Sequence, residues 1–495
     1  MKRKQLLMAI DIGTTNSKAA LFTWEGEMVA YASRRHTVDR PDALRAQHDA
    51  EKIWWEECCA VCREIVSHPV AEAAEIAGVS VSSLSPALVP VDRDGHALYP
   101  AMLYALDRRA FQEIKELGDA WNLYLITHGE GPVSPLSTGP KMLWLKKNEP
   151  EIFQKAAWFV GVPSFLIYRL TGKMVADYGC YRIAGFPYAR EKMDWDDAMC
   201  EACGVTKERL PELKFAIECA GTVTKDAAEM TGIPEGTPVA VGTGDFLAET
   251  LSYGSRFRSS IQMSFGTTIG VDMGTDHCSI LFPGYTPAIH RNAIPGGAMS
   301  NDCSTIDWVR GLIAGKGLAP DNEELFQMAD SIPAGSDGLV ILPYFNGEKK
   351  PFSDPNAKGM IFGLRMNHTA SHLYKASLES VAYSVRHCLS VYNPDEKRRE
   401  AVTMGGGTQI PGLLQTVSDV TGFTLTRLGV HNGTLLGDAF LAAMAGGIFT
   451  QREDIDPWIH VAGTVEPNTK NREIYDKGYQ LYRDLYEANA ELMHR

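Results

Sequence analysis

The chain has 495 residues, too many for one hydrophobic core, so two large or three smaller domains are expected. Hydrophobic residues make up 45% and charged residues 22%, a composition that excludes a disordered protein. The net charge is −13 without a basic cluster, so we expect no nucleic-acid partner. No apolar run approaches the roughly 18 residues of a membrane span, and a cytoplasmic protein with no membrane partner is expected.

The first predicted elements alternate between strands and turns. The apolar run at 6–12 is too short for the core of a signal peptide and predicts a strand, and Gly13-Thr14-Thr15 predicts a tight turn. Further predicted elements of this half are strands at 18–22, 28–34, 76–81 and 87–91, and helices at 50–67, 107–117, 141–147, 151–157 and 163–170.

The opening pattern recurs in the second half. An apolar run at 260–265, the turn Gly266-Thr267-Thr268 and a second apolar run at 269–273 repeat the strand, turn and strand of the N-terminus. This repetition predicts a duplicated architecture with a boundary near residue 250. Helices are expected at 305–313, 370–392, 413–420 and 435–445, and an amphipathic helix at 471–492 is expected to pack on a domain surface.

The ten cysteines form no regular disulfide framework, and a reducing compartment is expected. Two CxxC spacings, Cys59/Cys62 and Cys200/Cys203, leave open a four-thiolate zinc site. The large separation of the two pairs favours buried thiols instead.

Two common nucleotide-binding signatures are incomplete in this chain. The segment Gly311–Gly317 has three rather than four residues between its first two glycines, and Gly317 stands where a P-loop needs Ser or Thr. Gly242-Thr243-Gly244 lacks the third glycine of a dinucleotide fold.

Three other glycine segments could bind phosphate. In the two Gly-Thr-Thr turns, glycine lets backbone amides approach phosphate oxygens and threonine adds hydroxyl donors. Gly405-Gly406-Gly407 is predicted to open the helix at 413–420 and to offer the unpaired amides of a helix start. The alternative is that all three are ordinary turns.

Two aspartates accompany these segments. Asp11 ends a predicted strand directly before the first turn, where its carboxylate could hold Mg²⁺; alternatively it caps its own turn. Asp245 follows the apolar run 237–241 and could accept a proton from a substrate hydroxyl; alternatively it is the N-cap of a helix at 246–252.

Together the motifs resemble those of the FGGY carbohydrate kinases. In order, they are Asp11-Ile-Gly-Thr-Thr-Asn-Ser-Lys18, Lys141-Met-Leu-Trp144, Gly242-Thr-Gly-Asp245, Ser264-Phe-Gly-Thr-Thr268, Asn346-Gly-Glu with Asp354-Pro-Asn-Ala-Lys-Gly, and Gly405-Gly-Gly-Thr-Gln-Ile-Pro-Gly-Leu-Leu-Gln415 continuing to Gly422. The resemblance runs from about residue 6 to 490. It implies an α/β fold of two actin-like, ribonuclease-H-like domains, 1–252 and 253–495, around a central cleft.

The resemblance also implies roles for single residues, with ATP and Mg²⁺ as cofactors. Asp245 corresponds to the catalytic base and Asp11 to the magnesium-organising residue. The nucleotide-binding positions are Gly13, Thr14 and Thr15 in the first phosphate loop with Lys18 behind it, Gly266, Thr267 and Thr268 in the second, Gly406 and Gly407 against the adenosine, and Ile410 where relatives often have Ser or Asn.

The positions near the sugar are less specific. Asp107 and Arg109 match an Asp-x-Arg element near the substrate, although a helix-start ion pair is the alternative. Ser85 lies where many relatives have a Gly-Gln motif followed by Met-His or Arg-Glu, and Phe246 replaces a Gln found in several relatives. Fewer side-chain hydrogen-bonding groups would therefore face the sugar than in xylulose or glycerol kinases.

The function that these features predict is ATP-dependent phosphorylation of a small sugar or polyol, such as the ketose xylulose. The main alternative is a non-catalytic actin-like ATP-binding module or sensor. An acyl or acetate phosphotransferase would need a basic pocket for its acidic acceptor, for which Arg109 alone is weak support. A homodimer is a further expectation, by analogy with the family.

Overall fold

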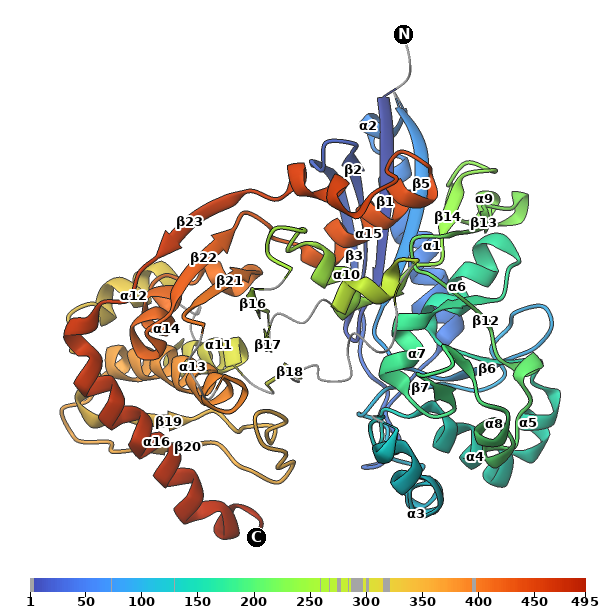
Figure 1. The fold of residues 1–495 in the computed structure, drawn as a ribbon. Coiled ribbons are helices and arrows are strands. Elements are labelled where there is room, and N and C mark those ends of the chain that lie inside the picture. The colour runs from blue at the N-terminus through green and yellow to red at the C-terminus, as the bar shows by residue number, and fades with distance from the viewer. Residues whose placement is uncertain are drawn as a thin grey trace. The chain divides into compact units, whose positions relative to one another are not determined.

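The computed structural model describes residues 4–72, 74–128, 130–258, 260–266, 268–273, 277–283, 285, 297–299, 302–314, 321–393 and 398–495. The chain divides into two compact units (Figure 1). The first comprises Met1–Ser255, His277–Asn292 and Gly433–Trp458, and the second comprises Arg256–Asp276, Ala293–Asn432 and Ile459–Arg495. The division therefore differs from one contiguous domain per half, because two later segments join the first unit.

A seven-stranded sheet organises the first unit, in the order β13-β14-β5-β1-β2-β3 with β15 also paired to β5. β1 is antiparallel to β2 and parallel to β5, and β2 is antiparallel to β3. The strands are β1 (Lys4–Ile12), β2 (Asn16–Thr23), β3 (Met28–Arg35), β5 (Ala74–Ser83), β13 (Cys219–Thr222), β14 (Pro238–Ala240) and β15 (Thr243–Gly244).

Both faces of this sheet are covered, so every residue of β1 from Leu6 to Ile12 is buried. Alternate β1 side chains pack into one hydrophobic cluster with helix α1 (Glu57–Val66). Helix α15 (Gly433–Ala445) lies against β1 and β5 (Figure 1). A Cβ on Gly78 of β5 would lie only 2.2 Å from the Ala442 carbonyl oxygen, which shows how closely α15 approaches the sheet.

The remaining elements of the first unit form a helical layer with short strand pairs. Its helices are α2 (Pro69–Glu72), α3 (Phe111–Thr127), α4 (Thr138–Asn148), α5 (Pro150–Lys155), α6 (Val162–Thr171), α7 (Tyr178–Ala184), α8 (Asp197–Cys203), α9 (Lys225–Thr231) and α10 (Asp245–Leu251). Its short strands are β4 (Gln47–His48), β6 (Val89–Val91), β7 (Ala101–Met102), β8 (Trp158–Val160), β9 (Val175–Asp177), β10 (Tyr188–Ala189), β11 (Asp194–Trp195) and β12 (Glu212–Lys214).

Two helices of this unit differ most from the predicted ones, and α3 also ends at Thr127 rather than at 117. The helix expected at 50–67 begins as a π-helix over Ala50–Glu56 and continues as α1. The helix expected at 107–117 begins only at Phe111, because Asp107 and Arg109 pair with each other in a buried turn before it.

The second unit repeats the sheet of the first in a six-stranded sheet of order β18-β17-β16-β21-β22-β23. β16 is antiparallel to β17 and parallel to β21, as β1 is to β2 and β5, which confirms the predicted duplication. The strands are β16 (Ile261–Phe265), β17 (Ile269–Asp272), β18 (Gly297–Ala298), β21 (Glu400–Met404), β22 (Thr424–Leu428) and β23 (Val461–Val465), and a separate hairpin joins β19 (Val340–Leu342) to β20 (Met360–Phe362).

The helices of the second unit are α11 (Asp302–Ala314), α12 (Asn322–Ala329), α13 (Ala370–Tyr392), α14 (Leu413–Thr421) and α16 (Arg472–Met493). Helix α16 buries Tyr475 and Tyr482 in the core of the unit, as its amphipathic pattern predicts. The prediction that the triple glycine opens α14 is wrong. A short 3₁₀ helix over Gly406–Gln409 comes first, and α14 begins after Gly412, because this glycine turns the chain in the left-handed region.

The two CxxC pairs lie in separate hydrophobic clusters of the first unit. Burial raises the pKa of Cys59 and of Cys200 to about 12, as expected for thiols packed among apolar side chains. Across the described ranges, no three His, Cys, Asp or Glu side chains gather in a way that could hold a metal ion. None of the helices described there is both long and apolar enough to cross a bilayer.

Candidate active site

Asp11 is placed by the register of the first sheet. It stands opposite Lys18 across the β1–β2 pair and opposite Ser82 across the β1–β5 pair. Lys18 Nζ lies 3.0 Å from Asp11 Oδ2, and the Ser82 hydroxyl donates to Asp11 Oδ1 at 3.4 Å. The Asp11 carboxylate raises the pKa of Lys18, so the pair is a buried carboxylate held by a permanent cation.

The Gly13-Thr14-Thr15 loop follows Asp11 and connects β1 to β2. The Gly13 amide donates to the Asn16 carbonyl at 2.9 Å, and a Cβ on Gly13 would lie 3.2 Å from that same oxygen. The Thr14 hydroxyl lies 3.2 Å from the Tyr104 hydroxyl. The loop is therefore tight and is fixed to a distant segment through one of its predicted phosphate-binding side chains.

His36 supports the same loop from the neighbouring strand. Its Nε2 lies 3.1 Å from the Gly13 carbonyl oxygen and its Nδ1 2.9 Å from Glu57 Oε2. The ring satisfies both acceptors at once only when both nitrogens carry a proton. The Ser17 hydroxyl donates to the same Glu57 oxygen at 2.7 Å. Sequence reasoning missed this support, because Glu57 lies on α1, far from the loop in the chain.

Asp245 comes to the same end of the sheet. Thr243 and Gly244 of β15 pair with Ser82 and Ser83 of β5, and Ser82 is also the β5 residue opposite Asp11. Asp245 directly follows β15 and therefore lies at the same level of the sheet as Asp11. Gly242 makes this path possible: its φ is +66°, and a Cβ there would lie 2.2 Å from the Val81 carbonyl oxygen.

The carboxyl of Asp245 has an unusual environment. The residue is the first of α10, after the N-cap Gly244, and its Oδ1 accepts the Phe246 amide at 2.7 Å. Burial, followed by the negative charge of Asp11, raises the pKa of Asp245 to about 7. A carboxyl that loses its proton near neutral pH is suited to general base catalysis.

A third aspartate, Asp438, was missed by sequence reasoning. It lies on α15, fully buried, and accepts the hydroxyls of Ser80 at 3.2 Å and Ser82 at 2.5 Å. Burial, with a contribution from Asp11, raises its pKa well above the usual value. An aspartate inside the apolar run 435–443 is the signal that could have identified it.

Asp107 and Arg109 form the ion pair that was the alternative interpretation of these residues. Arg109 Nε lies 2.9 Å from Asp107 Oδ1 and Nη2 2.7 Å from Oδ2, and Nη2 also donates to Gln47 at 2.8 Å. Both side chains are buried. Their polar atoms are engaged within the protein, and a contact with substrate stays a prediction.

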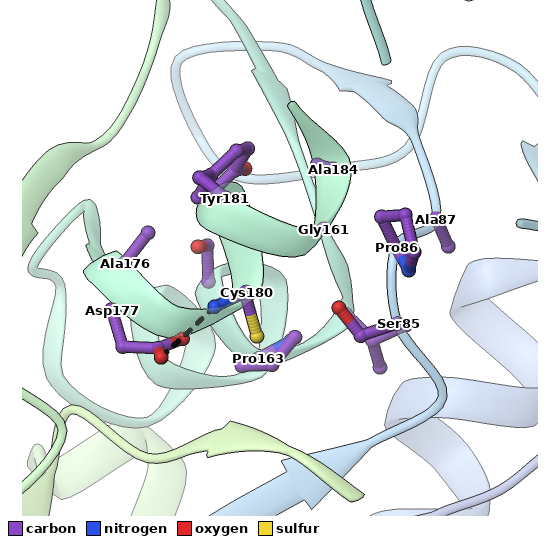
Figure 2. Close-up of a pocket in the computed structure, with 12 residues that line it drawn as sticks. Ser85, Pro86, Ala87, Gly161, Pro163, Ala176, Asp177, Cys180, Tyr181 and Ala184 are labelled. Atoms are coloured by element: carbon purple, nitrogen blue, oxygen red, sulfur yellow. Dashed lines mark hydrogen bonds between the residues drawn. The ribbon is translucent and has the colours of Figure 1, made fainter. Parts of the chain in front are cut away.

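Ser85 faces a small cavity of about 10 Å³, room for about one water molecule. Figure 2 shows its hydroxyl pointing toward the side of α7 that carries Cys180, with the Asp177 carboxylate bonded to the Cys180 amide. A Cβ on Gly244 would lie 3.0 Å from the Ser85 Cβ, so Ser85 packs directly beside the segment that carries Asp245. Phe246 is 43% exposed and lines a larger pocket.

In the second unit, the predicted nucleotide-binding segments meet at the end of one strand. Gly266 donates to the Thr268 carbonyl at 3.0 Å, so the second turn is as tight as the first. Gly405 has φ +98°, and a Cβ there would lie 2.6 Å from the Phe265 carbonyl oxygen. Gly407 also packs on Phe265, and Ile410 is partly buried against the core. Thr267 lies outside the described residues.

The structure thus brings Asp11, Lys18, Thr14 and Asp245 to one end of the first sheet, and Gly266 and Gly405–Gly407 to one end of the second. The strand ends of such sheets are the usual places for ligand-binding loops, since the sheet holds each loop at its base. The arrangement provides one carboxyl with a raised pKa and, at the end of each sheet, a tight glycine-containing turn.

Comparison with known proteins agrees with this arrangement. The family model "FGGY family of carbohydrate kinases, N-terminal domain" matches residues 6–251, and the C-terminal model of the family matches residues 262–446. A xylulose kinase of Escherichia coli (strain K12) is 28% identical, with 99% of this chain and 100% of that protein covered. A gluconokinase of Bacillus subtilis is 27% identical, with 77% and 75% covered.

Among solved structures, a xylulose kinase from Rhodospirillum rubrum matches with a TM-score of 0.81 and 27% identity, covering 99% of this chain and 100% of the other. The two sheets with their duplicated strand order are the two actin-like domains of this fold. The chain belongs to the FGGY family of carbohydrate kinases and is an ATP-dependent sugar kinase.

Proposed function

We propose that the chain transfers the γ-phosphoryl group of ATP to a hydroxyl group of a small sugar or polyol, with Asp245 as the catalytic base. The observation that carries this proposal is the position of Asp245 beside Asp11 at the strand ends next to the Gly-Thr-Thr loop, with its pKa raised to about 7. Asp245 would take the proton of the acceptor hydroxyl as the oxygen attacks the phosphorus.

Asp11 is the residue that would hold Mg²⁺. Its oxygens accept Lys18 and Ser82, and the residue is only 3% exposed. Magnesium needs only one or two carboxylates and keeps several waters, so one fixed carboxylate suits it. When bound, the ion neutralises charge on the phosphate oxygens. Lys18 would keep the Asp11 carboxylate oriented.

The glycine segments would bind the nucleotide. In the first unit, the Gly13–Thr15 loop is held by His36 and Tyr104, so its amides are fixed before ATP arrives. In the second unit, we assign Gly266, Thr267 and Thr268 to the phosphates and Gly406 and Gly407 to the adenosine.

The names of the relatives suggest the first acceptors to test. Xylulose kinases match nearly the whole chain, which makes a ketose such as xylulose one candidate, and gluconokinases make a sugar acid another. A cytoplasmic location, where ATP is available, is part of this proposal.

The test is an ADP-release assay over ketoses, alditols and aldonates, with Asp245→Ala as the blank for every acceptor. We expect ADP release above the blank with at least one acceptor. Nucleotide binding, measured as a thermal shift with ATP, should survive in Asp245→Ala. Thermal stabilisation by ATP without ADP release on any acceptor would contradict the proposal and support a non-catalytic nucleotide sensor.

A further inference from the structure

A pocket of about 290 Å³ lies wholly within the first unit, against the start of α10. Phe246 and Leu247 form one wall, so the pocket borders the helix turn that begins with Asp245. Gly179 and Ile183 of α7 contribute another part of the lining. Its volume is close to the lower end of the range for small-molecule sites, which suits a ligand of monosaccharide size.

The charged groups of the pocket are Arg182, Arg190 and Glu130. Within the described part of the chain, the Arg182 guanidinium makes no hydrogen bond or ion pair; it lies over the ring of Tyr285, whose centroid is 6.0 Å from its Cζ. Burial is the main cause that lowers the pKa of Arg182. A half-buried cation with so few partners is expensive to keep, unless a ligand completes its environment.

Other buried arginines of the same unit differ from Arg182. Arg109 binds Asp107 and Gln47, and Arg209 donates to the carbonyl oxygens of Phe153 and Ala156. These side chains have partners that fix the surrounding backbone. Arg182, on the last turn of α7 with its side chain at the pocket, has no such hydrogen-bond partner among the described residues.

Glu130 does not cancel the positive charge of the pocket. Its Oε1 accepts the backbone amide of Arg190 at 2.9 Å, so one of its oxygens is already used. Burial raises the pKa of Glu130 despite the attraction of Arg190 and Arg182. Among the described residues that line the pocket, the guanidinium groups of Arg182 and Arg190 accompany one carboxyl, that of Glu130.

From this pocket we infer that the acceptor is a polyhydroxy acid, an open-chain sugar acid whose carboxylate binds Arg182 while one of its hydroxyls is presented to Asp245. The inference rests on the proposed function. A guanidinium matches a carboxylate in geometry and charge. A phosphate monoester carries nearly two negative charges and would meet Glu130 as well, so a carboxylate is the better match.

The test uses acceptors that differ only at C1: D-glucitol, D-gluconate and D-glucitol 1-phosphate, with xylitol and D-xylonate as a five-carbon pair. We expect the acid of a pair to exceed its alditol in kcat/KM by roughly 10- to 100-fold, the value of a charge-assisted hydrogen bond. Neutral acceptors equal to or better than the acids would overturn the inference and leave the kinase proposal intact. Preference for the phosphate ester would also overturn it, and no ADP release with any acceptor would refute the proposed function itself.

Variants locate the carboxylate. Arg182→Gln should raise KM for the acid roughly 10- to 100-fold and should lower the kcat/KM of the alditol far less. Arg182→Lys should restore part of the loss, and Glu130→Gln should lower KM for the acid because a competing carboxylate is removed. Arg93→Gln, at an exposed turn of the same unit, is the matched control.

A thermal shift with ATP verifies that each variant is folded. If Arg182→Gln lowers the kcat/KM of the acid and of the alditol equally, or changes neither, Arg182 does not bind the carboxylate of the acceptor.

Discussion

The two units share one strand order but carry different side chains at equivalent places. Lys18 of β2, Asp11 of β1 and Ser82 of β5 lie in one row across the first sheet. The equivalent row of the second sheet has Gly270 of β17, Ser264 of β16 and Met404 of β21. The charged groups therefore occur only in the first unit's row. The comparison teaches that the duplicated fold supplies a glycine turn in each unit, while the ionisable groups of these two rows, for which we propose a role in metal binding, lie in the first unit.

The largest expected effect comes from removing the base. Asp245→Asn should lower kcat by about 10²–10⁴-fold, because proton transfer is lost while the shape is kept. Asp226→Asn, an exposed aspartate of the same unit, is the matched control. The measurement is steady-state ADP release with saturating ATP. Equal kcat values for Asp245→Asn and Asp226→Asn would contradict the assignment of Asp245 as the base.

The pH profile gives a second test of the same group. With a pKa of about 7, Asp245 is protonated below that pH and competent as a base above it. The kcat/KM of the wild type should therefore rise about tenfold per pH unit below pH 7 and level off above it. A profile that is flat between pH 5.5 and 8 would contradict this assignment.

Substitutions at equivalent positions of β1 and β16 compare the two units directly. Asp11→Asn should weaken the apparent affinity for Mg²⁺ by roughly 10- to 100-fold, because the ionised carboxylate is lost and Lys18 is left unpaired. Ser264→Ala, at the matching position of β16, should change the apparent affinity for Mg²⁺ by less than about threefold, because it removes no charged group. Initial rates at varied Mg²⁺ give both numbers, and comparable losses would contradict the asymmetry.

Two glycines in helices, one in each unit, test how closely the helices pack within their own unit. A Cβ on Gly437 of α15 would lie 1.9 Å from the Ala248 carbonyl oxygen, whereas one on Gly311 of α11 would meet no atom within 4 Å. Gly437→Ala should destabilise the protein by about 1–3 kcal/mol through overpacking, and Gly311→Ala should be neutral or stabilise it by up to about 1 kcal/mol. Thermal unfolding measures both, and an unchanged melting temperature for Gly437→Ala would contradict the close helix approach.

The smallest expected effect is on the pH dependence of the unfolding temperature. The folded-state pKa of Asp245, about 7, lies above the usual value for an aspartate, so the folded protein binds this proton more tightly than the unfolded chain does. That contribution is complete at low pH and is lost as the pH rises through about 7. Asp245→Asn should therefore unfold at a higher temperature than the wild type at pH 8, and the difference should shrink as the pH falls from about 7 toward about 4. A lower melting temperature at pH 8 would contradict the sign.

Much of the fold followed from local patterns. The apolar runs around each Gly-Thr-Thr turn predicted the first two strands of both sheets, and Asp11 and Asp245 were identified because each follows a buried run. The late start of α3 was not predicted, because the Asp107–Arg109 pair depends on Gln47, which is distant in sequence.

The partners of the candidate site were also beyond local reasoning. Tyr104, His36 and Asp438 come from three different segments and meet the site only when the sheet is assembled. Arg182 was not singled out from the sequence, because the few partners of its side chain are visible only in the folded pocket. The position of α15 in the first unit was not predicted either, because its sequence gives no sign of which sheet it covers.

The place of α15 in the chain has a consequence for biosynthesis. The ribosome makes most of the second unit before it makes the helix that covers β1 and β5 in the first. Until then, the side of β5 that carries Gly78, Ser80 and Ser82 is without its cover. A fragment that stops at Ser255 would expose this surface and aggregate, and adding a separate peptide spanning residues 433–458 should restore its solubility.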